Sequence, residues 1–121
     1  MAHKSVITLL SIADTPIDQE WGLQFVKDLP DNNGMLFKFQ SPRILSFWGK
    51  NTYLPLDIAF INEGVIVKTE RIAPLSLRSV TSGNPCTLAL EVPAGTLEKI
   101  GAEVGSTVEV DYNSKRVTFN D

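Results

Sequence analysis

The residues best suited to chemistry lie in one short stretch, FWGKNTYLPLDIAF, at positions 47–60. Polar side chains alternate there with aromatic and aliphatic ones, which is a composition typical of a small ligand pocket. In one interpretation Lys50 holds an anionic or carbonyl oxygen, and Asp57 accepts a hydrogen bond or a proton. The candidate ligand-binding residues are Trp48, Lys50, Asn51, Thr52, Tyr53 and Asp57.

The same stretch also has a structural interpretation, which we favour. Asn51 and Thr52 can hydrogen-bond their own backbone in a turn before Pro55. Asp57 can pair with Lys50 or accept a backbone N–H, because a buried carboxylate needs partners. Ion pairs of this kind perturb pKa values without catalysing a reaction. No catalytic residue is therefore assigned.

Histidine, cysteine and metal chemistry have little support in the sequence. The single histidine, His3, lies close to the N-terminus and is expected to be a tail residue. The single cysteine, Cys86, excludes an internal disulfide and lacks a neighbouring histidine, so we expect a buried structural thiol. No glycine-rich phosphate loop, calcium loop or zinc-ligand cluster occurs, and no cofactor or metal is expected.

The first half of the chain predicts three short strands and a helix. Residues 6–13 are aliphatic and β-branched and favour a strand. A helix over 16–27 follows, with Asp14 or Thr15 as its cap and Gly22 inside it. Residues 35–39 predict a strand that Ser41-Pro42 breaks, and residues 44–48 begin another.

The second half predicts two hairpins and a second helix. The 56–72 hairpin turns at Asn62-Glu63-Gly64, and the last hairpin joins 107–111 to 116–119. Between them, 73–86 is the best candidate for a mobile loop. Strand 87–92 alternates, with Leu90 inward and Ala89 and Glu91 outward. A short helix follows, with Thr96 as the N-cap and Gly101 as its end.

About seven short strands with one or two short helices predict a mainly β, compact single-domain fold that resembles a β-barrel. The 121 residues fit one domain, 1–121, with a core over about 5–119. Apolar residues make up 43% of the chain, enough to form a core without metal or disulfide cross-links.

Charge and hydropathy limit the partners. Eleven basic and fourteen acidic residues give a net charge of −3 with no basic stripe, so no nucleic-acid partner is expected. Residues 6–13 are too short and polar for a secretion signal, and no apolar run approaches the roughly 20 residues of a membrane-spanning helix. We expect a cytoplasmic protein without a membrane partner, or a virion component if the chain is phage-encoded. The oligomeric state stays open.

Several short motifs together resemble a known family. They occur in this order: Gly34-Met35-Leu36-Phe37, Phe47-Trp48, Lys50-Asn51-Thr52, Pro55-Leu56-Asp57-Ile58, Leu90-Glu91 and Pro93-Ala94-Gly95-Thr96. This pattern resembles the family called domain of unknown function 192, over about residues 5–112. The resemblance implies a β-rich barrel and no established reaction.

The chain differs from the family pattern at two informative positions. Gly49 stands where the family usually has methionine, and the smaller residue favours an open groove beside Trp48. Val26 stands where the family usually has arginine, so any anion contact from that side chain is missing.

Three functions fit the sequence. The first is a non-enzymatic binding or interaction module for a small ligand or a protein, with a groove around 48–57 bordered by 73–86. The second is a structural or assembly component that acts through its surface. The third, which we favour least, is a small hydrolase or lyase that uses Asp57 and Lys50.

Overall fold

Seven strands close a barrel in the computed structural model, which describes residues 4–120. The barrel order is β1-β2-β7-β4-β5-β8-β9, and β9 returns to pair with β1. Only the β1–β2 pair is parallel among these strands, and β3 and β6 form a separate two-stranded sheet. The elements are β1 (Lys4–Ala13), α1 (Pro16–Trp21), β2 (Asn33–Arg43), β3 (Ser46–Phe47), β4 (Leu56–Asn62), β5 (Val65–Ile72), β6 (Val80–Thr81), β7 (Cys86–Pro93), α2 (Thr96–Ile100), β8 (Thr107–Asp111) and β9 (Arg116–Asn120). The predicted mainly β, barrel-like fold is confirmed.

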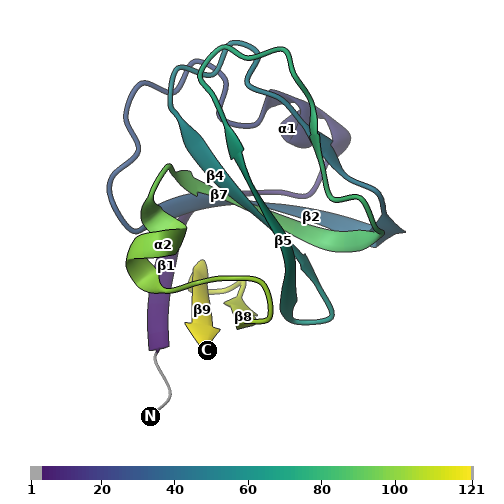
Figure 1. Cartoon of the computed structure of the whole chain (residues 1–121), viewed down its shortest axis with the longest axis vertical. Coiled ribbons are helices and arrows are strands. Elements are labelled where there is room, and N and C mark those ends of the chain that lie inside the picture. The colour runs from purple at the N-terminus through teal and green to yellow at the C-terminus, as the bar shows by residue number, and fades with distance from the viewer. Residues whose placement is uncertain (1–3, 121) are drawn as a thin grey trace.

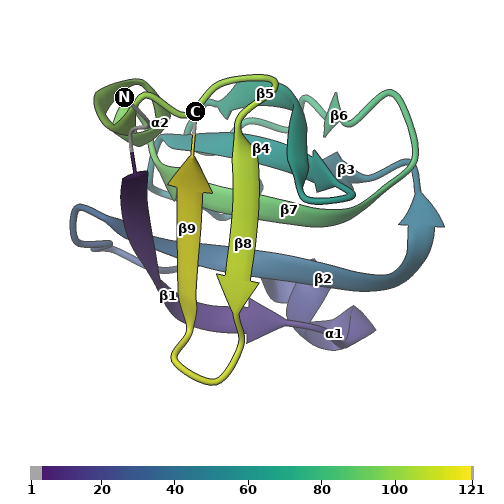
Figure 2. The same cartoon turned by 90° about the horizontal axis from the view of Figure 1, so that it is seen from below.

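The molecule has two apolar cores, one on each face of β2, β7 and β4. The barrel interior draws side chains from all seven strands, including Ile7, Leu90 and Val117. The second core lies on the outer face, where Phe37 and Phe60 pack under the segments that carry α1, β3 and β6. Figure 1 shows α1 and the long loops on one side of these strands, and α2, β8 and β9 on the other. In Figure 2 the β8–β9 hairpin crosses in front of β2 and β7.

The second core also buries the outward-facing side chains of β7. Ala89 and Glu91 do point away from Leu90 and the barrel interior, as predicted. However, Ala89 is fully buried and Glu91 is 4% exposed, because the loop layer covers the outer face. The outward face of β7 is therefore a second interior and not a solvent face.

Helix α1 is shorter than predicted, and helix α2 has a different N-cap residue. Helix α1 ends at Trp21 and not near residue 27, because Gly22 has φ 54° and ψ −134°, which are not helical angles. Thr15 caps α1 by accepting a hydrogen bond from the Asp18 N–H at 3.2 Å. Thr96 does not cap α2, since Gly95 occupies that position with a left-handed φ of 91°. Gly101 ends α2, as predicted.

The predicted break at Ser41-Pro42 is wrong, because β2 runs for 11 residues to Arg43. Pairing with β7 is interrupted between Lys38 and Arg43, so Pro42 sits where no ladder N–H is required. The strand predicted from residue 44 shrinks to the two residues of β3.

Both predicted hairpins are confirmed. The β4–β5 turn places Glu63 at φ 51° and Gly64 at φ 74°, and two positive φ values suit the twist of a two-residue hairpin. At the β8–β9 turn, the Asp111 carboxylate accepts the backbone N–H groups of Asn113 and Ser114 at 3.0 and 3.2 Å.

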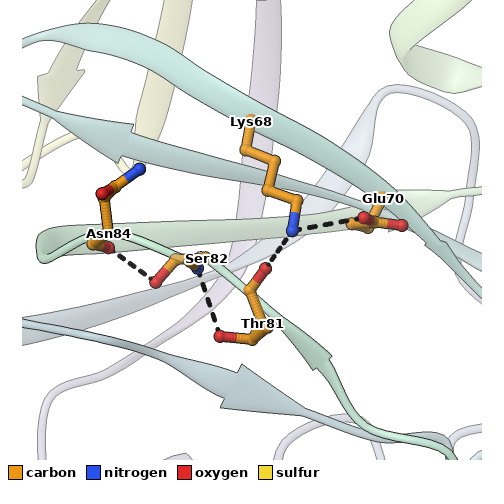
Figure 3. Close-up of polar contacts among 6 residues, drawn as sticks. Lys68, Glu70, Thr81, Ser82 and Asn84 are labelled. Carbon is orange, nitrogen blue, oxygen red and sulfur yellow. Dashed lines mark hydrogen bonds and ion pairs between the residues drawn. The ribbon is translucent and has the colours of Figure 1, made fainter.

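The 73–86 segment, predicted to be a mobile loop, contains β6 and is tied to its neighbours (Figure 3). The Lys68 ammonium donates to the Thr81 carbonyl oxygen at 2.7 Å and lies 3.4 Å from the Glu70 carboxylate. The buried Ser82 hydroxyl donates to the Asn84 carbonyl at 2.8 Å. It also accepts the Leu45 N–H at 2.9 Å. These contacts anchor the segment to β5 and to the residue before β3.

Candidate functional site

A cavity of about 200 Å³ opens into the second core, between the end of α1, the 46–52 segment, β2 and β7. It is smaller than the roughly 300–1,000 Å³ of pockets that hold drug-sized ligands, so it suits a small group. Its walls combine aromatic rings with a few polar side chains. The lining includes Glu20, Trp21, Phe37, Phe47, Trp48, Lys50, Thr52 and Glu91.

Glu91 is the buried acid of this cavity. Its side chain makes no hydrogen bond or ion pair with another residue in the described range 4–120. Burial therefore raises the pKa of Glu91 to about 8, and the carboxyl is neutral at pH 7. Within the same range, no fully buried polar side-chain atom lacks a partner, so the unpaired carboxyl oxygens must reach the cavity space. The acid thus faces the cavity and is free to bind there.

Sequence reasoning missed Glu91 as a candidate site residue. The available signal was an acidic residue inside the apolar run LALEV, since glutamate is rarely buried without a partner. Because the alternation of strand 87–92 placed Glu91 outward, its burial was not predicted.

The aromatic rings form an inner wall and a rim. Phe37 and Phe47 meet edge to face with centroids 4.9 Å apart and make the inner wall. Trp21 and Trp48 are 58% and 45% exposed and form the rim. The Lys50 ammonium lies 5.3 Å from the centroid of the Trp48 ring. The two tryptophans therefore lie at the mouth of the cavity and not in the core.

Asn51 and Thr52 shape the turn that carries Lys50. The Thr52 hydroxyl lines the cavity, but it already donates to the Lys50 carbonyl at 3.2 Å. Asn51 has a positive φ of 55°, and its carbonyl accepts the Phe25 N–H at 2.8 Å. Its side-chain amide donates to Gln24 at 3.4 Å. The Thr52 contact matches the structural interpretation, whereas the Asn51 side chain bonds a distant residue and not its own backbone.

Tyr53 lies outside the cavity lining. Its ring packs edge-on against Phe25 at 6.2 Å, and Phe25 in turn lies 5.7 Å from the Trp21 ring. The three rings form an aromatic row on the surface beside the cavity rim. All three are between 45% and 58% exposed.

Asp57 is separated from the other candidates because it lies on the opposite face of β4 from Leu56. It accepts the Arg71 guanidinium at 2.9 Å and the Gly95 N–H at 2.7 Å. Of the two partners expected for Asp57, the backbone N–H is present, from Gly95, and the pair with Lys50 does not form. A wider recess of about 590 Å³ lies beside Asp57, but there the carboxylate oxygens already have partners.

Gly49 does not open a groove. A Cβ at this position would lie 2.5 Å from the Ala73 carbonyl oxygen and 3.0 Å from the Ser76 nitrogen. The Gly49 N–H also donates to the Ser76 carbonyl at 2.8 Å. The backbone of the 73–76 segment fills the space that the smaller residue leaves, so the prediction of a groove from Gly49 is wrong.

The remaining candidates give no further site. His3 lies outside the described residues. The Cys86 thiol is buried in the second core, and burial raises its pKa. Across residues 4–120, histidine, cysteine, aspartate and glutamate side chains do not gather in a group of three that could hold a metal ion. Neither helix of this range is long and apolar enough to cross a membrane.

Two solved structures resemble this one closely. A Sinorhizobium meliloti protein described as a "putative transcription regulator" is 33% identical, with a TM-score of 0.81, and the match covers 90% of this chain and 93% of that one. A Novosphingobium aromaticivorans protein of unknown function is 28% identical, with a TM-score of 0.79, and the match covers 88% of this chain and 82% of that one.

Among curated proteins none matches the chain. Residues 2–110 match the family of domain of unknown function 192, described as an uncharacterized ACR. The match spans nearly the whole chain and includes the Trp48–Asp57 stretch, Glu91 and both helices. The chain therefore belongs to the domain of unknown function 192 family.

Proposed function

We propose that the protein is a small-ligand-binding module and that its site is the cavity between α1, the 46–52 segment and β7. The observation that carries the proposal is the Glu91 carboxyl, which is buried, unpaired and open to the cavity. A hydrogen bond contributes about 0.5–1.5 kcal/mol net. A ligand that pairs with Glu91 would gain that free energy.

The arrangement supports binding more than reaction. The cavity contains a single buried acid, and the Thr52 hydroxyl is already engaged by the Lys50 carbonyl. Asp57 and Lys50, the pair that a hydrolase or lyase would use, do not line the same recess. A binding role needs only the acid, the rings and a cavity that admits the ligand.

The Sinorhizobium relative raises the question of a nucleic-acid role. A regulator that binds nucleic acid directly is expected to carry a basic surface, and this chain has a net charge of −3. Acidic Glu20 and basic Lys50 both line the cavity, so the site itself is not strongly basic. A small ligand fits these charges better than a phosphate backbone.

A ligand-observed NMR screen of small polar metabolites tests the proposal. The wild type is compared with Glu91→Gln, which keeps the shape of the side chain, and with Trp48→Ala, which removes a rim ring. Glu109→Gln makes the same chemical change on an exposed position of β8 and is the matched control.

We expect ligands that bind the wild type and the control but are lost or weakened in both cavity variants. Each variant is first shown to be folded by its amide spectrum. Ligands that bind all four proteins equally, or a screen in which no compound binds the wild type, would overturn the proposal.

A further inference from the structure

The geometry points to an organic ammonium group as the ligand, held by the Glu91 carboxylate beside the aromatic rings that line the cavity. This inference rests on the proposed small-ligand function and names the chemistry of that ligand. It draws on three independent features of the cavity, namely its rings, its charges and its size.

Four aromatic rings contribute to the cavity lining. Trp21, Phe37, Phe47 and Trp48 all line the cavity. The two phenylalanine rings pack edge to face, with an interplanar angle of 71° and centroids 4.9 Å apart. The face of an aromatic ring attracts a cation within about 6 Å of its centroid, and desolvation strengthens the attraction. The Lys50 ammonium already uses one rim ring in this way, at 5.3 Å from Trp48.

The charges of the lining favour a single positive charge on the ligand. Glu91 is buried with no cationic side chain paired to it among residues 4–120. Glu20 adds a carboxylate to the lining, and Lys50 is the cationic residue there. With Glu91 ionised, the three groups sum to about −1 by their ordinary charges. A buried carboxylate is stable only when paired, so a monocation is the complementary partner.

The size of the cavity limits the ligand to a small ammonium compound or to the end of a longer one. Its 200 Å³ accommodates an ammonium with a few carbon substituents. The same chemistry has two sources, a free small ammonium compound or the modified lysine side chain of a protein. The test below separates them.

The test is an NMR and calorimetric titration with choline and with its uncharged carbon isostere, in which carbon replaces nitrogen. The two probes have the same shape and differ in charge. Acetyl-trimethyllysine amide is the third probe, because it presents the same cation on a peptide-like backbone. Each probe is titrated into wild type, Glu91→Gln and the control Glu109→Gln at several pH values.

We expect choline to bind wild type at least about tenfold more tightly than the isostere does, because the cation pairs with the carboxylate. Choline affinity should rise with pH up to about 8 and then level off, because only ionised Glu91 pairs with the cation. In Glu91→Gln both the preference for choline and the pH dependence should disappear, while the control behaves as wild type. Tighter binding of the lysine derivative than of choline would identify a protein side chain as the source.

Two other results would overturn the inference in distinguishable ways. If the isostere binds as well as choline, or affinity falls as pH rises, while Glu91→Gln still alters binding, then the cavity takes a neutral ligand. In that case the ammonium inference fails and the proposed function stands. If no probe and no compound from the screen depends on Glu91 or Trp48, both fail together.

Discussion

The carboxyl group of Glu91 is buried without a partner, and this should make the stability of the protein depend on pH. Its pKa is about 8 in the folded protein and about 4.5 in an exposed glutamate. Between these values the folded state keeps a proton that the unfolded state has released. The free energy of unfolding should therefore fall as pH rises from about 5 to about 8, by up to about 1.4 kcal/mol per pH unit from this one group.

Urea unfolding across this pH range measures the effect. Glu91→Gln should lose this contribution and become more stable than wild type at pH 8, since glutamine never ionises. Glu109→Gln, exposed on β8, should keep the wild-type slope. An unchanged slope in Glu91→Gln would mean that Glu91 is ionised or paired in the folded protein.

Asp57 should stabilise the fold mainly by accepting the Gly95 N–H. Asp57→Ala leaves the Gly95 N–H without its acceptor at 2.7 Å, and we expect a loss of about 1–3 kcal/mol in unfolding free energy. Arg71→Ala removes only the exposed side of the ion pair and should cost at most about 1 kcal/mol. Ligand binding in the cavity should be unchanged in both. Equal losses in the two variants would contradict the assignment of the main contribution to the backbone contact.

At the scale of elements, Gly34 sets the close approach of β2 to β7. A Cβ at position 34 would lie 2.7 Å from the Glu91 carbonyl oxygen and 3.0 Å from a Val92 methyl group. Gly34→Ala must separate two strands that are buried on both faces, so we expect a loss of about 1–3 kcal/mol. Thermal and urea unfolding measure it.

Gln40→Ala, exposed on the same strand, is the control and should change stability by less than about 0.5 kcal/mol. Gly34→Ala should also weaken binding in the cavity, because it displaces the backbone of Glu91. Wild-type stability in Gly34→Ala would show that β2 and β7 can separate at little cost.

At the scale of the whole molecule, net charge decides which large partners the protein can attract. With a net charge of −3, the chain should not shift the mobility of duplex DNA, even at low salt where charge contacts are strongest. A gel-shift assay with wild type checks this, and a basic DNA-binding protein serves as the positive control. A salt-sensitive shift would reveal a basic surface that the residue count does not show, and it would favour a regulatory role.

The sequence by itself determined the mainly β class, both hairpins and the family, because these depend on neighbouring residues or on whole-chain pattern. It also brought Trp48, Lys50 and Thr52 together, since they lie within five positions of one another. The length of α1 and the continuity of β2 escaped prediction, because the conformation of Gly22 and the interrupted pairing at Pro42 depend on neighbours distant in sequence.

Only the tertiary structure decided which segments cover each face of β7. Alternation in β7 separates Leu90 from Glu91, but a period of two residues says nothing about what packs over either face. The α1 and β3–β6 layer turns the outer face into a second core, and this burial gives Glu91 its cavity and its raised pKa. In the same way, Arg71 and Gly95 reach Asp57 from positions 14 and 38 residues away, so its partners were set by the fold and not by the local sequence.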